Sequence, residues 1–187
     1  MSFMTFIVSN AILIYVYALL MRVWMQWVRC DYYNPFAQAI VRITQPVVKP
    51  LRRIVPSLGP IDMATLLVAL ILTTVKLPLL LLIGSSTPVS SLSIGFYFLL
   101  GFAGLLKAIG NLIFWVLIIR AIMSWISQGR GAIDYLLYQL TEPLMSPIRR
   151  IIPPFGGIDF SIMALLFALT GLNYLGYDIM GALWGLL

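Results

Sequence analysis

Long apolar runs alternate with short polar segments along most of this chain. Four runs are close to the roughly 20 helical residues needed to cross a hydrocarbon layer about 30 Å thick. They lie at about Phe3–Trp27, Ile61–Ile83, Lys107–Ile126 and Ile158–Leu187. The pattern predicts an all-α membrane protein with about four transmembrane helices, and we expect no separate soluble domain.

A further apolar stretch, residues 92–106, runs directly into the third span. It is short for a crossing. A crossing here would also place the two basic connections of the chain on opposite sides of the membrane. We therefore expect an interfacial or re-entrant helix at 92–106, or an extension of the third span. A fifth crossing is the alternative.

Two motifs recur at nearly the same distance along the chain. RVWMQW (Arg22–Trp27) matches RAIMSW (Arg120–Trp125) at an offset of 98, and TQPVVKPLRRIVP (Thr44–Pro56) matches TEPLMSPIRRIIP (Thr141–Pro153) at an offset of 97. The matches predict two parallel repeats, each with a span, a basic amphipathic interfacial segment and a second span. Repeat 1 covers 1–83, a linker covers 84–106, and repeat 2 covers 107–187, with amphipathic segments at 28–60 and 127–157.

Residue patterns within these segments indicate helices that lie along the membrane interface. Asn34 and Pro35 suit the N-cap and first turn of a helix whose apolar residues then recur on one side, and Asp134 can cap a similar helix in the second repeat. A helix with one apolar and one polar side is typical of an interfacial location.

Composition fits a membrane location and removes several kinds of chemistry. The chain is 61% hydrophobic and 10% charged, whereas soluble domains average about 25% charged residues. It has no histidine and one cysteine, Cys30, which excludes histidine-based metal and haem sites, catalytic triads and an intramolecular disulfide. We expect no catalytic residues, no metal, no cofactor and no enzyme activity.

The basic residues concentrate in the two long connections between spans. The net charge is +6, and the middle connection, GSSTPVSS, carries no charge. The positive-inside rule therefore predicts that both basic connections are cytoplasmic and both termini lie outside. Membrane topology explains the charge, so we expect anionic lipids as partners and no nucleic acid. The basic residues are Arg29, Arg42, Lys49, Arg52 and Arg53 in the first connection and Arg130, Arg149 and Arg150 in the second.

Each repeat holds two arginines between prolines, Arg52 and Arg53 in the first and Arg149 and Arg150 in the second. These two arginine-containing segments are called the basic elbows below. We expect the prolines to break the helix and direct the chain. The guanidinium groups can bind lipid phosphates through forked hydrogen bonds. They are therefore topology determinants and lipid anchors, or they also dock a specific lipid or a membrane-protein partner. A homo-oligomer is a separate expectation for so small a bundle and rests on no particular residue.

An aspartate precedes the second span of each repeat, Asp62 in the first and Asp159 in the second. A carboxylate there can cap the helix and pair with the arginines. A cation or proton site at the cytoplasmic mouth is the alternative.

An arginine also precedes a tryptophan by five residues near the inner end of each first span. The pairs are Arg22 with Trp27 and Arg120 with Trp125. Snorkelling arginines beside an interfacial tryptophan belt explain the pattern. Arginines that face the bundle interior are the alternative.

Six polar residues fall in the outer halves of the predicted spans. Such groups either join helices by hydrogen bonds and snorkel, or mark a path for ions or solutes. They are Asn10, Lys76, Lys107, Asn111, Asn173 and Asp178.

The quoted motifs, together with CDYYNPFAQ and MSWISQGR, resemble the YggT family of bacterial inner-membrane proteins, with relatives of the YlmG type in Gram-positive bacteria and plastids. The resemblance covers essentially the whole chain and implies a multi-pass inner-membrane protein. Its members have been associated with osmotic and ion homeostasis, cell division and assembly of a b-type cytochrome. It carries over no catalytic residue. It favours a small transporter, channel or modulator in ion homeostasis; the alternative is a non-catalytic scaffold or assembly factor that docks through the basic elbows.

Overall fold

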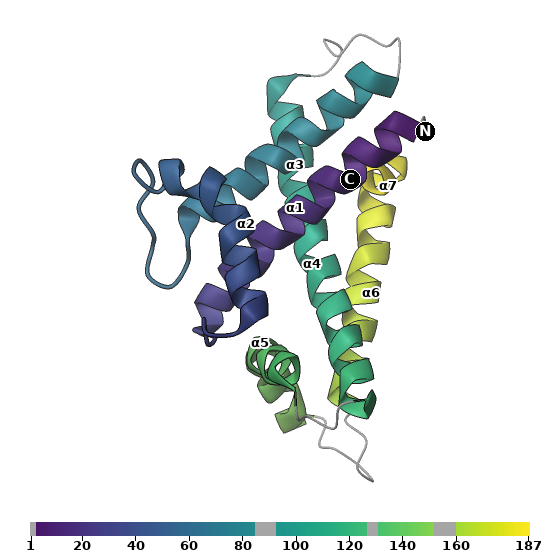
Figure 1. Cartoon of the computed structure of the whole chain (residues 1–187). Coiled ribbons are helices and arrows are strands. Elements are labelled where there is room, and N and C mark those ends of the chain that lie inside the picture. Colours follow the sequence, from purple (N-terminus) through teal and green to yellow (C-terminus); the bar gives the residue numbers. More distant parts are fainter. Residues whose placement is uncertain (1–2, 85–92, 127–130, 152–159) are drawn as a thin grey trace.

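The chain folds into seven helices within the residues that the computed structural model describes, 3–84, 93–126, 131–151 and 160–187 (Figure 1). An isolated bridge between Leu58 and Ile61 is the only β-structure in these ranges. In chain order the helices are α1 Phe3–Val28, α2 Pro35–Leu51, α3 Met63–Gly84, α4 Ile94–Ile126, α5 Ala132–Ile151, α6 Phe160–Met180 and α7 Ala182–Leu186.

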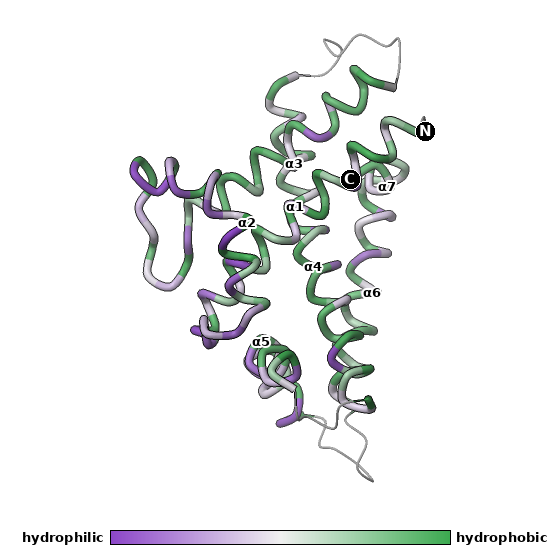
Figure 2. Tube along the Cα trace, in the orientation of Figure 1, coloured by the Kyte–Doolittle hydropathy of each residue, from purple (hydrophilic) through white to green (hydrophobic). Residues whose placement is uncertain are grey.

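Four of the helices, α1, α3, α4 and α6, are long and apolar enough to cross a membrane. Figure 2 shows that the hydrophobic residues follow these four helices, whereas the hydrophilic residues gather on α2, on the loop after it and on α5. The prediction of an all-α membrane protein with about four transmembrane helices is confirmed.

The structure changes the limits of two predicted spans. Residues 94–106 continue into the third span as the single helix α4, so they form an extension of that span and no separate re-entrant helix. The predicted span 158–187 is too long. It ends at Met180, because Gly181 adopts a positive φ of 57° that reverses the chain into α7, a conformation that glycine adopts without strain.

The two halves of the chain share an order of long, amphipathic and long helix. The ends of α1 and α4 differ by 98 residues, and the starts of α2 and α5, and of α3 and α6, differ by 97. These are the offsets of the sequence motifs. The duplication itself stays a prediction, which these positions support.

The core lies where α1, α3 and α4 meet. In Figure 1, α1 and α3 run side by side, α4 crosses them, and α6 lies along α4, as the helix contacts also show. Leu19 and Met25 of α1 are buried in this core, and α2 and α5 add Val48 and Leu140. The end of the molecule that carries α2, α5 and residues 52–62 is called the basic end below; the chain termini lie at the opposite end (Figure 1).

The amphipathic helices confirm one local prediction and correct two. The Asn34 side chain accepts a hydrogen bond from the Phe36 N–H and caps α2, with Pro35 in the first turn. Asp134 is no N-cap; it lies in the first turn of α5 and accepts from the Gly131 N–H at 2.9 Å.

The prolines do not break the helices where expected. The helix α2 continues through Pro46 and Pro50, and α5 continues through Pro143 and Pro147 to include both arginines of its elbow. All four prolines are exposed. An interior proline costs less where the carbonyl group left without an N–H partner is not sealed in a protein core.

Candidate functional site

Arg22 of α1 lies in a buried polar cluster at the basic end. Its side chain donates to Thr44 Oγ1 at 2.8 Å and to Gln45 Oε1 at 2.7 Å, both on α2. The Nε atom lies 3.9 Å from Asp62 Oδ2. Arg22 is only 3% exposed, so the prediction that it snorkels to the membrane surface is wrong. It faces the bundle interior and joins α1 to α2.

Asp62, which is 1% exposed, is the acidic centre of this cluster. Arg52 donates to its Oδ2 atom from Nε at 3.0 Å and also from Nη2. Thr65 donates to the carboxylate through its backbone N–H at 3.3 Å and its hydroxyl at 2.5 Å. The structure therefore places Asp62 both as a cap of α3 and as an ion-pair partner. Both carboxylate oxygens of Asp62 accept hydrogen bonds from Arg52 or Thr65. The carboxylate therefore suits a structural junction better than an open cation site.

Two opposing effects act on the pKa of Asp62. Burial raises it, and hydrogen bonds from Arg52 and Thr65 lower it by more, so the pKa lies below its ordinary value of 3.8. The carboxylate is thus ionised at neutral pH. Asp159, predicted to have the same role in the second repeat, lies outside the described residues.

Arg120 of α4 makes the corresponding contacts in the second half. It donates to Thr141 Oγ1 on α5, its Nη2 atom lies 3.7 Å from Glu142 Oε2, and its guanidinium lies 5.2 Å from the Tyr138 ring centre. Thr141 and Glu142 follow Thr44 and Gln45 by 97 residues. Like Arg22, Arg120 joins its span to the next amphipathic helix and does not snorkel freely.

The four elbow arginines divide into two kinds. Arg52 binds Asp62, and Arg149 binds Glu142 with Nη1–oxygen distances of 3.0 and 3.1 Å. Arg53 and Arg150 are exposed and form no ion pair with any other described residue.

The two predicted belt tryptophans are also exposed, as an interfacial position requires. The exposed fraction is 45% for Trp27 and 89% for Trp125.

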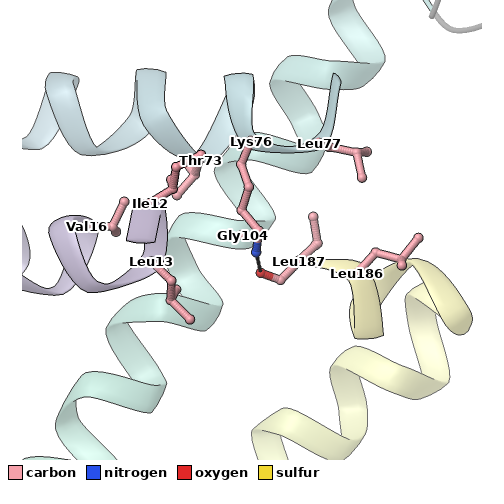
Figure 3. A pocket seen from close by; sticks show the side chains of 9 residues that line it. All are labelled: Ile12, Leu13, Val16, Thr73, Lys76, Leu77, Gly104, Leu186 and Leu187. Carbon is pink, nitrogen blue, oxygen red and sulfur yellow. Dashed lines mark hydrogen bonds between the residues drawn. The ribbon is translucent and has the colours of Figure 1, made fainter. Parts of the chain in front are cut away.

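Two lysines of the spans meet α7 at the opposite end. Lys76 of α3 donates to the Leu187 carbonyl oxygen at 2.5 Å, as Figure 3 shows, and Lys107 of α4 donates to the Trp184 carbonyl oxygen. The Lys107 ammonium lies 5.4 Å from the Trp184 ring centre. The indole Nε1–H of Trp184 donates to Asn173 Oδ1 of α6 at 2.8 Å. The short helix α7 is therefore tied to three spans.

The other predicted polar residues of this half do not join these contacts. Asn111 lies beside the Tyr17 hydroxyl of α1. Asn10 donates to the Phe6 carbonyl of its own helix at 2.8 Å, and Asp178 is exposed. The six residues therefore do not line one continuous row.

This half contains a small cavity and a groove. The cavity beside Lys76 and Leu187 has a volume of about 10 Å³, room for about one water molecule. A larger groove of about 580 Å³ between α4 and α6 is lined by Lys107, Asn111 and Asn173, among apolar side chains.

Sequence reasoning did not single out the partners of the two span arginines. Thr44 and Thr141 open the repeated TQP and TEP motifs, so their recurrence was a usable signal. Every fully buried side-chain nitrogen or oxygen in the described residues has a hydrogen-bond partner, and these residues contain no group of three potential metal ligands.

Comparison with known proteins places these features in a family. The family model described as CCB3/YggT matches residues 1–83 and 99–180. The chain is 50% identical over 184 residues to an "Uncharacterized protein in proC 3'region" of Vibrio alginolyticus, which covers 98% of each chain. It is 50% identical over 173 residues to "Uncharacterized protein YggT" of Escherichia coli, which covers 92% of this chain and 88% of the relative.

The chain is also 34% identical to a protein of Pseudomonas aeruginosa over 190 residues. The match covers 92% of this chain and 87% of the relative. No solved structure matches the chain. The family model covers most of the sequence in two segments that fall in the two halves of the fold. The chain is therefore a member of the CCB3/YggT family.

Proposed function

We propose that this chain is a non-catalytic scaffold of the bacterial inner membrane, which docks anionic lipids or partner proteins at its basic end. The supporting observation is the distribution of charge there. The two acids that take part in ion pairs, Asp62 and Glu142, are already bound by arginines. Five cations in the described part of this end are exposed and form no ion pair with a described residue: Arg29, Arg42, Lys49, Arg53 and Arg150.

Electrostatics support this role at an anionic membrane surface. Each basic residue near such a surface contributes on the order of 1 kcal/mol of attraction. By the positive-inside rule the basic end faces the cytoplasm, and both termini face outward. The exposed cations then lie on the leaflet where they meet anionic headgroups and cytoplasmic partners.

Single-cysteine labelling tests this orientation. Arg53 lies at the basic end, and Ile94 is exposed at the start of α4, at the opposite end. In spheroplasts, whose inner membrane is intact, a membrane-impermeant maleimide should label Ile94→Cys directly. It should label Arg53→Cys only after the membrane is permeabilised. The reverse order would contradict the orientation and with it the proposed cytoplasmic docking.

Proximity labelling tests the docking itself. The variant Arg53→Gln/Arg150→Gln removes two exposed charges and none of the ion pairs described above. It should lose reproducible partners that the unmodified chain labels. The variant Arg53→Lys/Arg150→Lys keeps the charge and should retain them. An unchanged partner set in the glutamine variant would count against docking at the elbows.

A role in ion or osmotic homeostasis is the second candidate. It is favoured by the two lysines in membrane-spanning helices and by the 580 Å³ groove beside Lys107. A route through this half requires α7 and the adjoining Leu187 to leave Lys76 and Lys107, because the carbonyl groups of Leu187 and Trp184 accept hydrogen bonds from the two lysines. Solute flux into liposomes that contain only this protein tests the idea, and the absence of flux at every osmolarity and pH would remove it.

A further inference from the structure

Three stripes of different character run along α2. The first is buried against the rest of the protein and contains Ala37, Thr44 and Val48. The second is polar and contains Gln38, Arg42, Gln45 and Lys49, whose spacing of four, three and four residues keeps them on one side of the helix. The third is apolar and exposed and contains Phe36, Ile43 and Val47.

The polar and apolar stripes lie on opposite flanks of the buried stripe, since each residue advances about 100° around a helix. A helix with this pattern lies in the plane of the membrane boundary, with its apolar flank in the acyl region and its polar flank among the headgroups. The polar flank of α2 is therefore at headgroup depth.

Tyr32 and the polar stripe, together with Val41 and Pro46, line an open groove of about 660 Å³. Arg42 and Lys49 give its lining two positive charges, and no lining residue is acidic. Gln45 directs its Oε1 atom to Arg22, 2.7 Å away, which leaves its amide nitrogen as the donor. The pKa of Tyr32 is raised above 10.0, mainly by burial and to a smaller extent by the nearby Cys30. The phenol therefore keeps its proton at neutral pH and is also a donor. Cations and donors suit an anionic oxygen ligand.

The second half of the chain lacks this arrangement. At an offset of 97 the polar stripe becomes Tyr135, Gln139, Glu142 and Ser146 on α5. The two cations are replaced by neutral residues, and the added acid already pairs with Arg149 and Arg120. The charged groove is thus a property of the first half alone, which the shared fold of the two halves does not explain.

We propose that the groove between Tyr32 and the polar stripe of α2 binds the headgroup of one anionic phospholipid, through its phosphate. Arg42 and Lys49 are seven residues apart, or about 10 Å along the helix, and both long side chains reach a phosphate held near Gln45. The acyl chains of the lipid remain in the adjacent hydrocarbon layer. This site rests on the proposed lipid docking and gives it a location distinct from the elbows.

Lipid binding to the purified, delipidated full chain tests the proposal by native mass spectrometry. The unmodified chain should bind one phosphatidylglycerol more than about tenfold tighter than phosphatidylcholine. Arg42→Gln/Lys49→Gln should weaken phosphatidylglycerol binding about 25-fold, because each cation near an anionic lipid contributes roughly fivefold, and should leave phosphatidylcholine unchanged. The swap Arg42→Lys/Lys49→Arg should retain binding, which separates charge loss from misfolding.

The charge-matched control is Arg53→Gln/Arg150→Gln, which removes two exposed charges from elsewhere at the basic end and should therefore weaken the binding of a lipid held in the groove by much less than the roughly 25-fold expected for Arg42→Gln/Lys49→Gln. Equal losses in both glutamine variants would mean diffuse attraction; they would overturn the groove and leave general lipid docking intact. A wild-type chain without preference for phosphatidylglycerol would contradict the groove and the lipid-docking part of the proposed function, whereas docking of partner proteins is decided by the proximity labelling. Displacement of the lipid by millimolar inorganic phosphate would assign the groove to a soluble anion instead.

Discussion

Substitution of Asp62 by asparagine isolates the charge at the centre of the Arg22 cluster. Asparagine has nearly the same shape, and its side-chain oxygen can still accept from the Thr65 N–H, so the cap of α3 remains. The negative charge that faces Arg22 and Arg52 is lost. Because the side chain of Arg22 is only 4% exposed, its positive charge then lies in the protein interior without an acidic neighbour at this distance.

The expected cost follows from this burial. Removing one partner of a buried ion pair typically costs about 3–5 kcal/mol, because the remaining charge stays desolvated. Arg22 keeps its bonds to Thr44 and Gln45, which places the expected loss near the lower limit, about 3 kcal/mol. The matched control is Glu142→Gln in the second half. Glu142 is 30% exposed, so solvent screens its pairs and the loss should stay near 1 kcal/mol.

Reversible unfolding in mixed dodecylmaltoside and dodecyl sulfate micelles, followed by circular dichroism, measures both free energies. The pH dependence gives a second readout. Since the pKa of folded Asp62 lies below 3.8, its contribution is fully present above that ordinary value and is lost as the pH falls through the lower folded pKa. Asp62→Asn should lack this acid-dependent loss.

If Asp62→Asn costs no more than Glu142→Gln, the buried charge of Arg22 does not depend on Asp62. A double-mutant cycle with Arg22→Met gives an independent check, because the two substitutions remove opposite charges from one site. The coupling energy should be about 1–3 kcal/mol and favourable. Strictly additive effects would show that the 3.9 Å approach of Arg22 to Asp62 has no energetic consequence.

Three further predictions concern packing and reactivity. A Cβ atom at Gly101 would lie 2.6 Å from Thr74 Cα, so Gly101→Ala should push α3 away from α4. The free energy of unfolding should fall by about 1–3 kcal/mol. The matched control is Gly110→Ala, where no atom lies within 4 Å of the added Cβ, and in the same assay it should be neutral or stabilising by up to about 1 kcal/mol. Trp184→Ala should release α7, and limited proteolysis should then cut there faster than in wild type; unchanged cleavage would mean that the lysine contacts hold it alone. Cys30 is buried, and burial raises the pKa of its thiol above 9.0. A membrane-permeant maleimide at pH 7 should therefore modify Cys30 much more slowly in the folded chain than in the unfolded chain. Equal rates in the two states would contradict the burial of Cys30.

The sequence predicts the parts of this fold that local physics decides. Apolar runs of bilayer length give the spans, and Asn34 followed by Pro35 gives the start of α2, since these features depend on neighbouring residues alone. The match between Thr44 and Thr141 also indicates where similar contacts recur.

Contacts between distant elements could not be predicted in the same way. Arg22 precedes a tryptophan near the end of a span, which is also the pattern of a snorkelling residue; only the position of α2 shows that its side chain turns inward. The reversal at Gly181 lies within an apolar run, where hydropathy cannot distinguish a continuing helix from one that folds back. The exposed prolines of α2 and α5 likewise required knowledge of which side faces away from the protein.

The span arginines have a consequence for the order in which the chain folds during synthesis. Arg22 and Thr44 are 22 residues apart, and Arg120 and Thr141 are 21 apart, so each pair can join as soon as its amphipathic helix leaves the ribosome. Such local contacts form quickly because little chain entropy is lost. Asp62 reaches Arg22 only with the next segment. Each half can therefore form its arginine–threonine contact before the following span enters the membrane.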